Sequence, residues 1–84
     1  MARYYFDIHD SGAFFDDIGS ELPDLLSVRK EALAALPAIA AEQIPLGEDR
    51  RHFTVLVKDE NATPIYSATL TFTGIWLTKP PTKV

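Results

Sequence analysis

One helix-length segment, flanked on both sides by segments that alternate between apolar and polar residues, limits the folds open to this chain. Residues 24–42 repeat their apolar side chains with the spacing of an α-helix. Residues 2–9, 52–59 and 65–74 alternate with the period of two that is typical of half-buried strands, and residues 13–17 predict a short second strand. The predicted order is ββαββ, an α+β fold in which one helix covers one face of a mostly antiparallel, four-stranded sheet.

The helix is expected to begin at Asp24, whose carboxylate can accept hydrogen bonds from backbone N–H groups of the first turn. Pro37 lies inside the segment. Because proline lacks a backbone N–H and crowds the preceding turn, we expect a kink near Pro37 or a break at residues 34–36. The predicted core joins the apolar arc of the helix to the inward faces of the strands: Leu25, Leu26, Val28, Ala32, Leu33, Leu36, Ile39 and Ala40 with Tyr4, Phe6, Ile8, Phe53, Val55, Val57, Tyr66, Ala68, Leu70 and Phe72.

The length of the chain and its lack of cysteine predict a small core without covalent reinforcement. The chain has 84 residues and no cysteine, so neither a disulfide nor a thiolate metal site can support it. A domain of this size buries only about two thirds of its unfolded surface, and dimerisation is a common way to bury more. We expect a single ββαββ domain over residues 1–78, a flexible C-terminal tail over residues 79–84, and a homodimer.

The charge of the chain excludes some partners. Eight Lys and Arg residues against twelve Asp and Glu residues give a net charge of −4. An acidic chain without a basic stripe is a poor candidate for direct nucleic-acid binding, which depends mainly on phosphate neutralisation. No apolar run reaches the ~20 residues of a membrane-spanning helix, and no apolar signal core opens the chain, so a cytoplasmic location without a membrane partner is expected. A basic protein is one candidate partner.

The acid-rich segment at residues 7–24 contains a candidate metal site. Asp7 and His9 are two apart on a predicted strand and therefore point to one face. If the hairpin register brings Asp16 across from Asp7, the three side chains offer an oxygen and nitrogen set suited to Mg²⁺, Mn²⁺ or Zn²⁺. A register shift of one residue would separate them, and exposed strand residues beside a polar turn explain the same pattern.

Arg29 is the unexpected residue of the predicted helix, because it falls within the apolar arc. A guanidinium group there must reach solvent or find an anion. The nearest candidate anions are Asp16, Asp17 and Asp24, which predicts a structural ion pair that ties the turn to the first helical turn. The alternative is that Arg29 binds the carboxylate or phosphate of a ligand.

The sequence shows no catalytic motif. It lacks cysteine, a Gly-x-Ser-x-Gly motif and a Gly-rich phosphate loop, and acidic residues near the helix start are interpreted as caps. We therefore expect no catalytic residues, no cofactor and no enzymatic activity. Trp76, with Ile75 and Leu77, either folds back to complete the core or forms an exposed interface anchor, since tryptophan is enriched in binding hot spots.

Several short motifs, in order, resemble a family of short bacterial proteins catalogued only as a domain of unknown function and common in alphaproteobacteria. These motifs are "ARYYFDIHDSG" at the start, Asp16-x-x-Gly19-x-Glu21-Leu22-Pro23-Asp24, Arg29-x-Glu31-Ala32, and "VKDENATPIYSATLTF" near the end. The chain departs from the family at Pro37, where a helix usually continues, and at Asn61-Ala62, where an Asp-Gly turn is usual. The family has no established activity, so the resemblance implies no chemistry. A looser likeness, at the level of the fold, is to HicB-type antitoxin domains.

Three functions remain open from the sequence. The first is a small non-enzymatic interaction or regulatory domain, joined as a homodimer through sheet edges or through the open sheet face and the Trp76 segment. The second is a divalent-metal-binding module or hydrolase that uses Asp7, His9 and Asp16. The third is an antitoxin-like partner protein whose acidic segment meets a basic protein.

Overall fold

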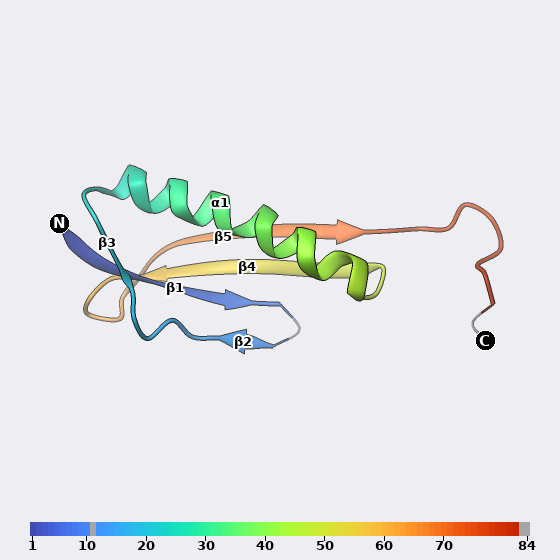
Figure 1. The fold of residues 1–84 in the computed structure, drawn as a ribbon, viewed down its shortest axis with the longest axis horizontal. Coiled ribbons are helices and arrows are strands. Elements are labelled where there is room, and N and C mark those ends of the chain that lie inside the picture. The colour runs from blue at the N-terminus through green and yellow to red at the C-terminus, as the bar shows by residue number, and fades with distance from the viewer. Residues whose placement is uncertain (11, 83–84) are drawn as a thin grey trace.

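The computed structural model describes residues 1–10 and 12–82, and shows one helix packed on one face of an antiparallel sheet (Figure 1). The elements are β1 (Ala2–His9), β2 (Ala13–Phe14), β3 (Ser20–Leu22), α1 (Leu25–Gln43), the short 3₁₀ helix η1 (Ile44–Leu46), β4 (Arg50–Lys58) and β5 (Pro64–Thr73). The predicted α+β class is confirmed.

The sheet has five strands, with the order β2-β1-β4-β5 and with β3 also paired to β1. The sequence predicts four strands, and the difference arises between β1 and the helix. There β2 pairs with the end of β1 and β3 pairs with its start, with the turn at Asp16 between them. The interruption at Asp16 divides what would otherwise be one partner strand for β1.

The core lies between α1 and the central strand β4. Strand alternation turns Phe53, Val55 and Val57 toward the helix, and all three are fully buried. The other fully covered apolar side chains come from one stripe of the helix, namely Val28, Ala32, Leu36 and Ala40. Burying each of the larger side chains contributes about 1.5–3 kcal/mol, and partly buried residues of β1 and β5 pack around this cluster.

The helix begins as predicted and continues past its proline. The Asp24 carboxylate accepts a hydrogen bond from the Ser27 N–H at 2.7 Å and caps the helix. The backbone N–H of Ser27, and then its hydroxyl, lower the pKa of Asp24. Of the two alternatives at Pro37, the break is wrong, because α1 runs unbroken through it. Pro37 is exposed, so the carbonyl that lacks its helical donor can bind water.

The turn between β4 and β5 depends on Asp59. Its carboxylate accepts hydrogen bonds from the N–H groups of Asn61 (2.9 Å) and Thr63 (3.0 Å). Ala62 has a φ of 61°, a conformation that favours glycine. The hydrogen bonds of the Asp59 carboxylate therefore hold Ala62 in a conformation that its Cβ disfavours.

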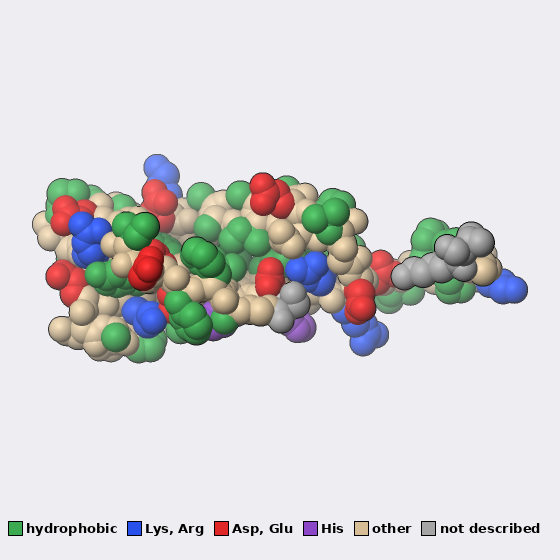
Figure 2. Space-filling view, turned by 60° about the horizontal axis from the view of Figure 1, so that its bottom comes forward, with side chains coloured by type: hydrophobic (Ala, Val, Ile, Leu, Met, Phe, Trp, Pro, Cys, Tyr) green, Lys and Arg blue, Asp and Glu red, His purple; other side chains and the backbone are tan. Residues whose placement is uncertain are grey.

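The molecule is long and exposes much surface for its size. It measures 53 × 21 × 17 Å, and its radius of gyration is 15.9 Å, against about 12 Å for a compact domain of this length. Its accessible surface is 6311 Å², against roughly 5,000 Å² for a folded monomer of this mass. Part of the excess is the segment after β5, which stands away from the body of the domain (Figure 2). Residues 79–82 of the predicted tail lie in this segment, and residues 83–84 are outside the described part.

Candidate functional site

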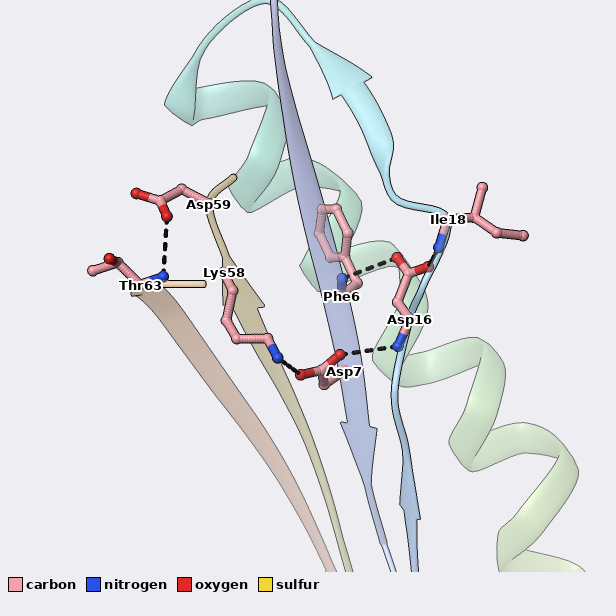
Figure 3. Close-up of polar contacts among 7 residues, drawn as sticks. All are labelled: Phe6, Asp7, Asp16, Ile18, Lys58, Asp59 and Thr63. Atoms are coloured by element: carbon pink, nitrogen blue, oxygen red, sulfur yellow. Dashed lines mark hydrogen bonds and ion pairs between the residues drawn. The ribbon is translucent and has the colours of Figure 1, made fainter. Parts of the chain in front are cut away.

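A buried ion pair joins the first strand to the central strand. Asp7 points to the sheet face away from α1 and is only 1% exposed. One of its carboxylate oxygens lies 2.7 Å from the Lys58 Nζ, and the other accepts a hydrogen bond from the Asp16 N–H at 3.0 Å (Figure 3). Both oxygens of this buried carboxylate are therefore used within the chain, as burial of a charge requires.

The Asp16 carboxylate organises the turn that divides β2 from β3. It accepts hydrogen bonds from the N–H groups of Ile18 and Gly19 at 3.0 Å and of Phe6 at 3.1 Å (Figure 3). Gly19 has a φ of 78°, and a Cβ at Gly19 would approach the Tyr4 carbonyl oxygen to 3.0 Å. Burial alone would raise the pKa of Asp16, but the three backbone N–H groups, with Arg3, lower it below its ordinary value.

Replacing Asp16 by asparagine should lower the free energy of unfolding by about 1–3 kcal/mol at neutral pH, because an NH₂ group replaces an accepting oxygen. The pKa of Asp16 is lowered on folding from its ordinary 3.8. The stabilisation is therefore fully present above this value and is lost as the pH falls through the folded-state pKa.

Urea denaturation across the acid range measures this effect as the gap in stability between the wild type and Asp16→Asn. The gap should stay constant near neutrality and shrink in acid. Asp17→Asn, which changes the exposed neighbour, serves as the control and should shift stability by no more than about 0.5 kcal/mol. A gap for Asp16→Asn that does not change with pH would contradict the role given to its charge.

The three candidate metal ligands are not assembled as a ligand set. Ile8 pairs with Phe14, one residue away from the register that would place Asp16 directly across from Asp7. The contact between the two aspartates is made by the Asp16 N–H, and the His9 ring packs edge-on against Phe15 at 5.9 Å. In the described residues, no group of three or more His, Cys, Asp or Glu side chains is placed to hold a metal ion.

The ion pair predicted for Arg29 is not formed among the residues that the structure describes. Arg29 is exposed, the Asp16 carboxylate is taken up by backbone N–H groups, and Asp24 caps the helix. The exposed Asp17 does not pair with Arg29 either. The physical reason is that backbone N–H groups of the turn and of the first helical turn already bind the carboxylates of Asp16 and Asp24.

Arg3 is the cation at this turn. Its guanidinium donates to the Ile18 carbonyl at 2.8 Å and lies 3.3 Å from the Glu21 carboxylate. Sequence reasoning missed this pair, because it depends on the register that places Arg3 opposite Glu21. Pairing residues 20–22 with the start of β1 would have predicted the contact between Arg3 and Glu21.

The outer edge of β5 is a second candidate site. β5 pairs along one side with β4, and no strand within the described ranges pairs with its other side. It is ten residues long, and the sequence has no charged residue from position 64 to position 78. A long edge strand without charges presents unpaired backbone groups that favour pairing with another chain. The β2 side differs, because β2 has only two residues and the Asp16 turn follows it.

An apolar groove lies beside the start of β5. It has a volume of about 250 Å³ and is lined by Leu25, Leu26, Val28, Arg29, Ile65 and Tyr66. The predicted core includes Leu25 and Leu26, and the structure corrects this: they are 65% and 79% exposed. The reason is that the first turns of α1 lie beyond β5, on the side away from β4 (Figure 1). Their side chains therefore have no strand beneath them.

Trp76 lies near the opposite end of β5. It is 56% exposed and lines a shallow hollow with Asp49, Gly74 and Ile75. Its neighbours Ile75 and Leu77 are also exposed. Of the two sequence interpretations, completion of the core is therefore wrong for this chain taken alone, and the interface anchor remains a prediction.

Fold and site together define a small α+β domain with one α-helix on the sheet and a network of ion pairs and hydrogen bonds on its β2 side. Its β5 edge is uncharged and is unpaired within the described residues. The chain belongs to a family described as a domain of unknown function, DUF6894, whose sequence profile matches residues 3–71. This confirms the predicted membership of a family of unknown function. No curated protein and no solved structure matches the chain. None of the helices in the described ranges has the length and apolar character needed to cross a membrane.

Proposed function

We propose that this domain acts through protein–protein association, as a non-enzymatic homodimer joined along β5. The observation that carries the proposal is the ten-residue, uncharged edge of β5, which is open on its outer side in the described part of the chain. Antiparallel pairing of β5 with β5 of a second copy supplies each strand with backbone hydrogen bonds and closes with two-fold symmetry.

The surface of the chain supports this proposal. The excess over a compact monomer is about 1,300 Å², obtained from the 6311 Å² observed and roughly 5,000 Å² expected. A standard interface buries about 1,600 Å² in total, or about 800 Å² on each partner. Pairing along β5, together with covering the apolar residues at its two ends, would bury an area of about this size.

The interior polar groups favour an interaction role over catalysis. Asp7 is bound by Lys58 and by the Asp16 N–H, and the Asp16 carboxylate is bound by three backbone N–H groups. Groups that are fully satisfied within the chain stabilise the fold and are not available to a substrate. The net charge of −4 makes a basic protein the complementary partner for such a dimer, in a cytoplasmic setting.

Sedimentation velocity over low to high micromolar concentrations tests the proposal. We expect a species of twice the 9.3 kDa chain mass, in an equilibrium that depends on concentration. A monomer at every concentration would overturn the homodimer.

A further inference from the structure

We infer that residues 74–78 of each copy dock into the apolar groove at the start of the other copy's β5, with Trp76 as the anchor. The inference rests on the proposed β5 dimer and adds the site that fixes its register. The occupant is a second copy of this chain, because both halves of the contact are exposed on the same sequence and cannot meet within one molecule.

The groove and Trp76 of one copy are too far apart to meet. The groove lies at Ile65 and Tyr66, near the beginning of β5, whereas Trp76 follows its end. A strand of ten residues is roughly 33 Å long. Trp76 is only three positions beyond Thr73, so the chain between them reaches at most about 11 Å. Trp76 therefore cannot fill its own groove while β5 remains paired.

Antiparallel pairing of the two β5 strands brings each segment 74–78 to the groove of the other copy. In an antiparallel pair, the end of one strand lies beside the start of the other. A two-fold dimer along β5 therefore carries each copy's segment 74–78 to the other copy's groove, twice in one interface. Figure 1 shows the first turns of α1 on the outer side of β5, where the segment from the other copy would run.

The alternation of side chains along β5 determines which side of the sheet Trp76 lies on. Tyr66 and Ala68 lie across from Val57 and Val55, so the even-numbered residues of β5 from Tyr66 onward face the helix. If the extended backbone continues to Trp76, its side chain has the same facing. A register centred on Leu70 keeps the two helix faces together and places the partner's Gly74 opposite Tyr66. The partner's Trp76 then lies just beyond Tyr66, beside the groove.

The chemistry of the groove suits an indole ring. Its lining is apolar except for Arg29, whose predicted ion pair is absent from the described part of the structure. A guanidinium at the rim can stack on an aromatic ring, and tryptophan gives the strongest such attraction. This arrangement also explains why an arginine stands within the apolar arc of the helix. No charged residue occurs from 64 to 78, so none is buried when the segment docks.

Cross-linking between copies provides the first test, because the chain has no cysteine. Leu26→Cys and Thr78→Cys, which both keep Trp76, are made as separate proteins, mixed, and oxidised. We expect a mixed disulfide dimer that joins one variant to the other, because only contact between copies can bring the two positions together. Leu46→Cys mixed with Thr78→Cys is the control, since Leu46 is exposed and follows the end of α1, whereas the groove lies at the start of α1. Mixed cross-linking no greater than in the control would overturn the inference.

Tryptophan fluorescence provides the second test, because Trp76 is the only tryptophan. Its emission should shift to shorter wavelength as dimer forms, and Trp76→Ala should raise the dissociation constant at least about tenfold, as loss of a hot spot does. A dimer whose emission does not shift, and whose affinity is unchanged in Trp76→Ala, would overturn the docking and leave the β5 dimer standing. A monomer at all concentrations would overturn both.

Discussion

Replacing Lys58 by methionine is expected to lower the free energy of unfolding by about 3–5 kcal/mol, because the change leaves a buried carboxylate without its partner. The reason is that Asp7 remains 1% exposed and loses the ammonium group that lies 2.7 Å from it. Its remaining hydrogen bond, from the Asp16 N–H, cannot compensate a buried charge. Urea denaturation at fixed protein concentration measures the loss, which is a large part of the stability of a small domain.

Two further variants separate the ion pair from a general effect of removing lysine. The double variant Asp7→Asn/Lys58→Met should be more stable than Lys58→Met alone, because the buried group is then neutral and can still accept from Asp16. Lys30→Met removes a charge from an exposed helix position and should shift stability by no more than about 0.5 kcal/mol. A loss below about 1 kcal/mol for Lys58→Met would show that water reaches Asp7 and replaces the partner.

The parts of the fold that sequence reasoning predicted correctly are set by local physics. Alternation assigns Phe53, Val55 and Val57 to the core, because a strand turns successive side chains to opposite faces. Asp24 is recognisable as the helix cap because a short acidic side chain before an apolar repeat satisfies free N–H groups. Such features depend on neighbours in sequence, so they can be predicted without knowledge of the tertiary structure.

The predictions that failed concern strand register and the position of the helix relative to the sheet. Arg3 and Glu21 meet only because β3 returns along β1. The Asp16 carboxylate accepts from Phe6 of β1 as well as from Ile18 and Gly19 of its own turn, in place of Arg29. Leu25 has the period of a core residue, yet it is exposed because α1 starts beyond the sheet edge. A helical wheel assigns a residue to a face but does not show where the neighbouring sheet ends.

Introducing two lysines on β5, in the variant Ser67→Lys/Thr71→Lys, is expected to convert the dimer into a monomer at micromolar concentration. Both side chains are exposed on the sheet face away from α1, so the core is unchanged. The two-fold arrangement doubles the effect, because four like charges then line one junction, and lysine on an edge strand opposes pairing with another strand. We expect the dissociation constant to rise at least about a hundredfold, which corresponds to about 2.7 kcal/mol.

The pairing of β4 with β5 supplies a matched control for this experiment. His52 lies directly across from Thr71 on β4, on the same face, so His52→Lys adds a lysine to this face without reaching the outer edge. It should leave the dimer intact, whereas Thr71→Lys alone should weaken it. Sedimentation velocity gives the two dissociation constants, and circular dichroism confirms that each variant is folded. Equal weakening by both lysines would assign the contact to the open sheet face, where the two residues are neighbours, and would remove β5 edge pairing as the basis of the dimer.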